Sequence, residues 1–230
     1  MIARSKRYKN SAKDLSPDEE LSLTDALGRL AGFGKANFDE TVELSFSLGV
    51  DPKQSSLAVR GTVNLPNGSG KEIRVLVFTE KPDEALSAGA DIAGLDDLIS
   101  KIKDGWLDFD VALSTTGAMK TVRSIARVLG PRGLMPTPKA GTVTDDMDAA
   151  VKAVKAGRVE FKMDKTGALA VVIGKRSFSQ EQLEENAKSA LEAVMASRPE
   201  GLKGRFVKTI YISSTMSPSV RIAGSTIAQS

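Results

Sequence analysis

The sequence contains neither cysteine nor histidine. A chain without cysteine forms no disulfide and offers no thiolate as a nucleophile or metal ligand. The absence of histidine excludes Ser-His-Asp and Cys-His arrangements and most zinc sites. Any chemistry would depend on carboxylates and on Lys, Ser, Thr or Tyr side chains. We expect no catalytic residues, no metal and no cofactor, because the motifs described below do not complete a site for any of them.

Long apolar runs are also missing from the chain. No continuous stretch is long enough to cross a bilayer, and the N-terminal residues are basic and polar, unlike a signal peptide. We expect a cytoplasmic protein that makes no membrane contact.

Aromatic residues make up only 5% of the sequence, with a single tryptophan, Trp106, which we expect to pack in the core. The chain therefore lacks the interleaved aromatic residues on which many proteins stack single-stranded bases. If it binds RNA, it would have to recognise shape, backbone and 2′-hydroxyl groups.

Positive charge is concentrated in particular segments, although the formal net charge is only +3. Residues 1–13 carry five cations and no acid, and residues 111–144 repeat that composition. Basic segments attract nucleic acids because their binding releases counterions. These segments are candidate nucleic-acid surfaces, and the alternative is an ordinary solvated surface.

Two kinds of secondary-structure pattern alternate along the chain. Near the N-terminus, Ser16 is predicted to begin a helix. Polar and apolar residues alternate through residues 41–48, which predicts a strand with one solvent-exposed face. From Gly70 onward, strands and helices alternate, which indicates a small parallel sheet covered on both faces. After Arg158, residues 164–167 are predicted to form a hairpin turn, and Ser179 is predicted to cap a long helix.

The order of these patterns predicts a fold that is both α/β and α+β. We expect a discontinuous α+β domain of split β-α-β type, formed by residues 1–68 and 158–230. A Rossmann-like α/β domain, residues 69–157, would be inserted into it. Two successive domains would produce similar patterns, so this alternative stays open.

The loop at residues 129–143 contains three prolines and three glycines, which together impose a stiff backbone path. It carries two cations, Arg132 and Lys139, and these are candidate secondary contacts for an anionic partner such as RNA. One alternative is a plain helix-to-strand connection. Another is an enzyme that clamps a phosphorylated substrate here, but the glycines at residues 68–70 and 32–34 do not complete a nucleotide-binding motif.

The predicted terminal strands offer a second candidate surface. Thr209, Tyr211, Ser213 and Thr215 share one strand parity, as Thr41, Glu43 and Ser45 do on the first strand. Hydroxyl groups on such a face could contact phosphate and ribose. The alternative is a sheet face that is simply exposed to solvent and binds no partner. The cations expected beside it are Lys175, Arg176, Lys208 and Arg221.

Several motifs resemble those of one known family, that of the bacterial large-subunit ribosomal stalk proteins. The main motif runs through residues 130–136 and 138–143. Shorter motifs agree in order along almost the whole chain: residues 38–43, 60–63, 105–110 and 214–216.

This resemblance implies a non-enzymatic protein whose discontinuous domain binds large-subunit rRNA at the mobile stalk near the tRNA exit site. It further implies transient contact with exit-site tRNA and translational repression through binding of its own mRNA. We expect a monomer when the protein is free of the ribosome. The segment from Arg205 to the end of the sequence carries three cations and no acid, like the basic residues 1–13. A third possibility, a scaffold without RNA contact, would leave both basic segments unexplained.

Carried over by position, the rRNA contacts implied by the resemblance fall on Phe38, Thr41, Thr209, Thr215 and Met216. We add three further candidates: Lys175 and Arg221 as phosphate contacts, and Ser217 as a hydroxyl donor. Ser217 stands where the family usually has glycine, which affects how closely RNA approaches the backbone there.

Overall fold

The computed structural model describes residues 4–13, 15–16, 19–52, 54, 57–202 and 204–224. Its contacts divide the chain into two compact units. Unit 1 comprises Met1–Gly70 and Val159–Ser230, and unit 2 comprises Lys71–Arg158. Among the described residues, no helix has the length and apolarity needed to span a membrane.

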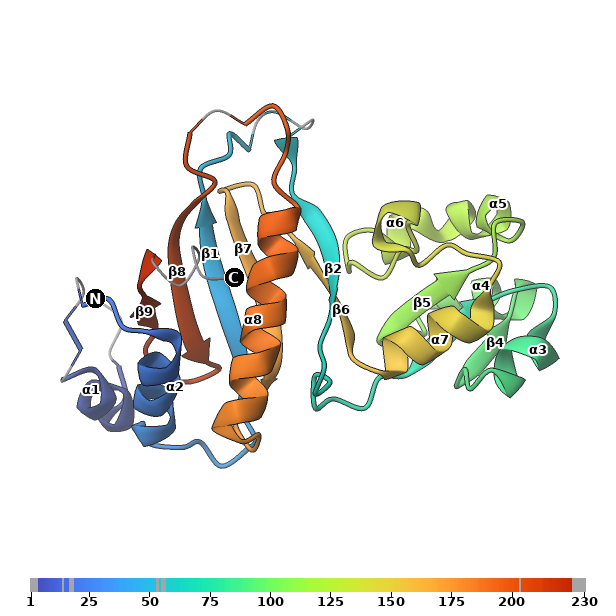
Figure 1. Cartoon of the computed structure of the whole chain (residues 1–230). Helices are drawn as coiled ribbons and strands as arrows, with labels where there is room; N and C mark the ends of the chain where they lie inside the picture. Colours follow the sequence, from blue (N-terminus) through green and yellow to red (C-terminus); the bar gives the residue numbers. More distant parts are fainter. Residues whose placement is uncertain are drawn as a thin grey trace. The chain divides into compact units, whose positions relative to one another are not determined.

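Unit 1 is built on a four-stranded antiparallel sheet (Figure 1). Its strands, in spatial order, are β7 (Ala168–Lys175), β1 (Thr41–Leu48), β8 (Val207–Ser214) and β9 (Val220–Ile222). Since β1 is antiparallel to both neighbours, β7 and β8 run in the same direction on either side of it. The helix α8 (Gln180–Ala196) connects them, and the three elements form a split β-α-β arrangement.

Two helices, α8 and α2 (Leu23–Gly32), cover one face of this sheet. The alternating residues Val42, Leu44, Phe46 and Leu48 of β1 point into the core beneath them, as the sequence pattern predicts. The predicted start of α8 is confirmed, because Ser179 and Gln182 form a complete capping box. A short helix, α1 (Lys6–Ala12), precedes these elements.

The predicted helix start at Ser16 is wrong. Ser22 is the N-cap of α2, and its Oγ accepts a hydrogen bond from the Asp25 amide at 3.1 Å. The segment before it is extended instead, because the Leu21 amide donates to the Arg221 carbonyl of β9 at 3.1 Å. Pro17 and Asp18, the other residues of the expected start, lie outside the described residues.

The predicted hairpin at residues 164–167 is also wrong, although a turn is present there. The Thr166 amide donates to Asp164 Oδ1 at 2.7 Å, but the two flanking strands belong to different sheets. β6 (Arg158–Lys162) pairs with β2 (Arg60–Asn64), while β7 pairs with β1. The Phe161 ring on β6 packs so closely on Gly61 of β2 that a Cβ there would lie 2.7 Å from it, which favours the long-range pairing.

Unit 2 contains the predicted parallel sheet. Its strands are β4 (Ile92–Gly94), β3 (Val75–Phe78) and β5 (Val111–Ser114), in that spatial order. Residues of β3 contribute alternately to two cores. One core includes α3 (Pro82–Ser87) and α7 (Met147–Lys155), and the other includes α4 (Asp96–Lys103).

The helix predicted before the Pro- and Gly-rich loop is interrupted. It consists of α5 (Met119–Val122), the 3-10 turn η2 (Arg123–Ile125) and α6 (Ala126–Leu129). The loop that follows contains η3 (Pro138–Ala140), which ends at Gly141 with a left-handed φ of 63°. Trp106 is half-buried against Phe109, their ring centroids 5.7 Å apart, in agreement with the expected packing role.

Candidate nucleic-acid interface

The face of the unit 1 sheet opposite α2 and α8 carries rows of small polar side chains. Strand register aligns Ser45 of β1 with Tyr211 of β8, and Ser47 with Thr209. Glu43 is the acid in these rows, opposite Ser213. The predicted hydroxyl-bearing face is therefore confirmed as a structural feature.

At one end of this face, three of the predicted RNA-contact residues touch one another. Lys175 Nζ donates a hydrogen bond to Thr41 Oγ1 at 2.9 Å. The Thr41 amide donates to Thr215 Oγ1 at 3.1 Å, and the Thr215 amide donates back to the Thr41 carbonyl at 3.1 Å. These residues come from three different strand ends.

Two large apolar side chains adjoin these residues along the chain. Phe38, just before β1, is 53% exposed, and Met216, just after β8, is 51% exposed. Exposed side chains of this size are candidates for contact with a partner. We call the five residues Phe38, Thr41, Lys175, Thr215 and Met216 the strand-end cluster.

The other predicted contacts lie elsewhere or are already engaged. Thr209 is six positions from Thr215 along the sheet face, a distance of about 20 Å. Arg221 is opposite Tyr211 and forms an ion pair with Glu20 at 2.7 Å. The Ser217 hydroxyl accepts from the Ser214 amide at 2.9 Å, so it serves the turn after β8.

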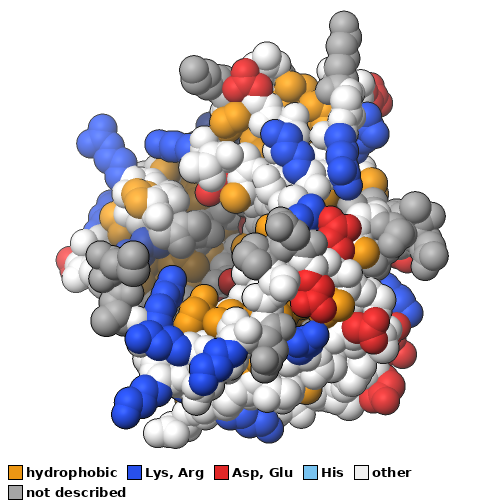
Figure 2. Space-filling view, turned by 90° about the vertical axis from the view of Figure 1, so that its left-hand side faces the viewer, with side chains coloured by type: hydrophobic (Ala, Val, Ile, Leu, Met, Phe, Trp, Pro, Cys, Tyr) orange, Lys and Arg blue, Asp and Glu red, His pale blue; other side chains and the backbone are white. Residues whose placement is uncertain are grey.

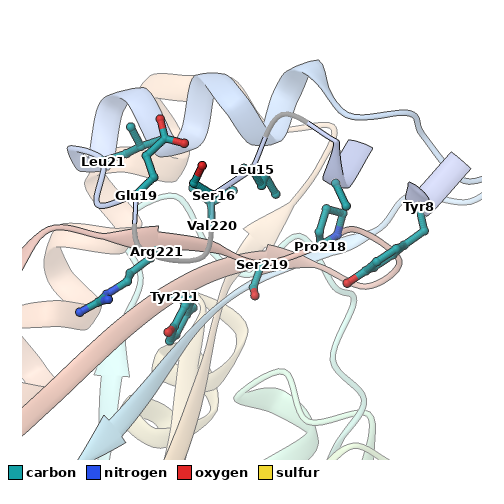
Figure 3. A pocket seen from close by; sticks show the side chains of 11 residues that line it. Tyr8, Leu15, Ser16, Glu19, Leu21, Tyr211, Pro218, Ser219, Val220 and Arg221 are labelled. Carbon is teal, nitrogen blue, oxygen red and sulfur yellow. The ribbon is translucent and has the colours of Figure 1, made fainter. Parts of the chain in front are cut away.

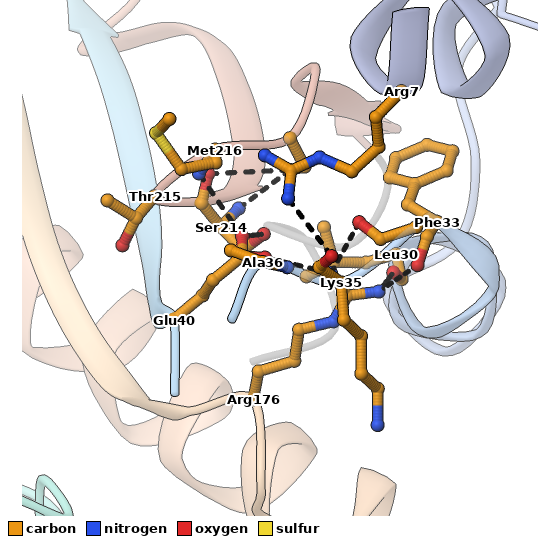
Figure 4. A network of polar contacts seen from close by, with 12 residues as sticks. Arg7, Leu30, Phe33, Lys35, Ala36, Glu40, Arg176, Ser214, Thr215 and Met216 are labelled. Atoms are coloured by element: carbon orange, nitrogen blue, oxygen red, sulfur yellow. Dashed lines mark hydrogen bonds and ion pairs between the residues drawn. The ribbon is translucent and has the colours of Figure 1, made fainter. Parts of the chain in front are cut away.

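Beneath the strand-end cluster lies a buried carboxylate, Glu40, which is 1% exposed. Its Oε2 accepts hydrogen bonds from Ser214 Oγ at 2.5 Å and from the Met216 amide at 3.1 Å. Its Oε1 accepts from the Ala36 amide at 2.7 Å. Figure 4 shows these groups converging on Glu40. The carboxylate thus joins the start of β1 to the end of β8.

The guanidinium of Arg176 compensates this buried charge, with Nη1 3.3 Å from Glu40 Oε1. Its Nη2 also donates to carbonyl groups at the end of α2, including Leu30 at 3.0 Å and Phe33. The free carbonyls of a helix C-terminus are favourable partners for a cation. Arg176 was expected among the surface cations beside the sheet, and that interpretation is wrong because its side chain is only 7% exposed.

The pKa of Glu40 is lowered from the ordinary glutamate value by this environment. Burial alone would raise the pKa, because it disfavours the charged form. The hydrogen bonds from Ser214, Ala36 and Met216, together with the charge of Arg176, outweigh that effect. Glu40 is therefore ionised at neutral pH.

The basic N-terminal helix α1 is attached to the segment that leads to Glu40. Arg7 Nη1 donates to the Lys35 carbonyl at 3.0 Å, while Arg4, Lys6 and Lys9 are exposed. Figure 2 shows the side of unit 1 that carries α1 and β9, where Lys and Arg side chains lie on both halves of the face and most Asp and Glu side chains lie on its right. Positive charge therefore lies near the strand-end cluster.

Two cavities are lined by described residues. One, of about 280 Å³, lies between α1 and β9 and includes Tyr8, Tyr211 and Glu19 in its lining (Figure 3). The other, of about 320 Å³, is in unit 2 and is lined by acids that include Asp145 and Asp148. Each lining contains a cation beside its acids, and neither contains the loop cation Arg132.

The loop cations of unit 2 are placed only in part. Arg132 is exposed, in the turn that includes Gly133 with a φ of 73°. The Lys139 side chain lies outside the described part of the structure. Thr137 Oγ1 is buried in the same loop without a hydrogen-bond partner among the described residues.

The sequence reasoning placed Arg176 on the surface and gave no role to the buried residues Glu40 and Ser214. A signal for two of them was present. Glu40 has the same parity as the buried residues of β1, and Ser214 has the same parity as Ile210 and Ile212 of β8. The parity rule, extended by one position at each strand end, would have predicted both to be buried.

Comparison with known proteins gives one consistent result. Residues 30–218 match the family described as "Ribosomal protein L1p/L10e family". The chain is 48% identical over 224 residues to "Large ribosomal subunit protein uL1" of Kosmotoga olearia, with 96% of this chain and 97% of that protein covered. The proteins of the same name from Thermosipho melanesiensis and Bifidobacterium longum are 47% and 46% identical, with at least 99% of this chain covered in each case. The chain therefore belongs to the ribosomal protein L1p/L10e family.

Proposed function

We propose that this protein is a constituent of the large ribosomal subunit that binds large-subunit rRNA through the strand-end cluster of unit 1. The observation that carries the proposal is the contact of two hydroxyls and a cation at the strand ends, with two exposed apolar side chains close by along the chain. Thr41 and Thr215 offer hydroxyls to ribose and phosphate, and Lys175 offers a positive charge. Phe38 and Met216 offer apolar surface to bases or sugars.

As a member of a ribosomal protein family, the protein is not an enzyme. The cations of α1 add an electrostatic component to the proposed interface. Such contacts strengthen association without reading sequence, because they neutralise phosphates. Specific recognition would therefore depend on the strand-end cluster, and general affinity on the basic surface around it.

The finer features of the proposal concern the two units. Unit 1 would be the discontinuous rRNA-binding domain, and unit 2 the inserted domain with a secondary RNA contact at Arg132 and Lys139. We further propose a position at the mobile stalk, with transient contact to exit-site tRNA. The protein would also repress translation by binding its own mRNA through the surface that binds rRNA.

The test is binding to a large-subunit stalk RNA fragment, compared with an unrelated structured RNA of equal length, across a range of salt concentrations. We expect affinity for both to fall with salt, and the stalk fragment to bind more tightly throughout. An RNA copy of the protein's own messenger leader should compete with the stalk fragment. Equal affinity for the stalk and unrelated RNAs would refute specific rRNA recognition.

A further inference from the structure

We propose that Glu40, compensated by Arg176, is the positioning residue of this interface: it fixes the turn after β8 in its RNA-binding geometry before RNA arrives. The inference rests on the function proposed above and deepens it. Glu40 cannot act by touching RNA, because it is 1% exposed. Its effect must pass through the residues it holds.

The hydrogen bonds of Glu40 reach the turn at two points. Oε2 accepts from Ser214 Oγ at 2.5 Å and from the Met216 amide at 3.1 Å, so it brackets Thr215 on both sides. Thr215 is also held by its backbone and hydroxyl contacts with Thr41. Hydrogen bonds to a charged acceptor are stronger than neutral ones, so the carboxylate is well suited to fix this short segment.

The other carboxylate oxygen connects the turn to the rest of unit 1. Oε1 accepts from the Ala36 amide at 2.7 Å and lies 3.3 Å from Arg176 Nη1. Arg176 in turn donates to the carbonyl of Leu30 at the end of α2. Through Glu40 and Arg176, the turn after β8 is therefore connected by hydrogen bonds and an ion pair to the end of α2, to the segment before β1 and to the end of β7.

A fixed turn favours binding because the bound conformation does not have to be selected from many. Ordering a flexible segment on association reduces affinity, so pre-organisation increases it. The exposed Met216 side chain and the Thr215 hydroxyl would both lose defined positions without the carboxylate. The expected effect is therefore on RNA binding as well as on stability.

The experiment is Glu40→Gln in the full-length protein, which keeps the size of the side chain and removes its charge. We expect affinity for the stalk RNA fragment to fall about tenfold at a temperature where the variant is fully folded. Amide hydrogen exchange at Met216 should be faster in the variant without RNA. Ser214→Ala, which removes one donor and keeps the charge, should show the same effects more weakly.

A structural control separates positioning from mere loss of stability. Leu191 is 1% exposed in the middle of α8, so Leu191→Ala destabilises unit 1 without touching the turn. We expect Leu191→Ala to leave both RNA affinity and Met216 exchange unchanged when the protein is folded. A double-mutant cycle adds a second criterion: Glu40→Gln should cost much less affinity in a Met216→Ala background than in the natural sequence.

Two different failures can be told apart. If Met216→Ala by itself leaves stalk RNA affinity unchanged, the proposed interface is wrong. If Met216→Ala weakens binding but folded Glu40→Gln does not, the interface stands and the positioning role of Glu40 is refuted. Additive effects in the double-mutant cycle would also refute it.

Discussion

The two exposed apolar side chains of the strand-end cluster provide the sharpest test of the interface. Phe38 and Met216 are 53% and 51% exposed. Truncating both to alanine removes surface that faces water in the free protein and would face RNA in the complex. We therefore expect the double variant Phe38→Ala/Met216→Ala to lose affinity for the stalk RNA fragment.

The size of the effect follows from the exposed fractions. Fully burying a Phe or Met side chain stabilises by about 1.5–3 kcal/mol. About half of each side chain remains to be buried, so the pair contributes about 1.5–3 kcal/mol to binding, or about 10-fold to 100-fold in Kd. Because both side chains are neutral, the dependence of log Kd on log salt should stay the same.

The assay is a titration of labelled stalk RNA at several salt concentrations, with folding checked by circular dichroism. The chain offers a matched control, since Leu86 of α3 is 47% exposed but lies in unit 2. Leu86→Ala should leave the affinity unchanged. If the double variant binds like the natural protein, or if Leu86→Ala weakens binding equally, the reasoning from exposed apolar surface is wrong.

Three further predictions follow from the same structure. Lys175→Met should reduce the slope of log Kd against log salt by about 0.7–0.9, the value for one phosphate contact. The control Lys162→Met, at an exposed position of β6, should leave that slope unchanged. Arg132→Ala should weaken binding less than Lys175→Met does. The lowered pKa of Glu40 stabilises the folded state above pH 4.5, its ordinary value, and that stability is lost as the pH falls through the lowered pKa. Urea unfolding between pH 7 and pH 3 should therefore show a shallower loss for Glu40→Gln, and identical profiles would contradict this. Thr137→Val removes a buried unpaired hydroxyl and should raise the unfolding free energy of unit 2 by about 1 kcal/mol; a loss measured by urea unfolding would count against it.

The accuracy of the sequence reasoning depended on the range of the interactions that decide each feature. Residues 41–48 were predicted as a strand with one solvent-exposed face, and β1 has that burial pattern. The capping box at Ser179 was also predicted correctly, because its partners are three residues apart. The hairpin at residues 164–167 was not, because β6 pairs with a strand about a hundred residues earlier in the sequence.

The sequence by itself determined the elements whose pattern is local: the alternation of β1, the two-sided burial of the parallel sheet and the hydroxyl parity of β8. It also carried the family motifs. Only the tertiary structure decided which charged side chains are exposed on the surface and which are buried. Glu40 and Arg176 are separated by more than a hundred residues, and the local sequence around either one does not predict their ion pair. A buried ion pair forms only where the fold brings two strand ends together, and a local sequence pattern does not predict which ends those are.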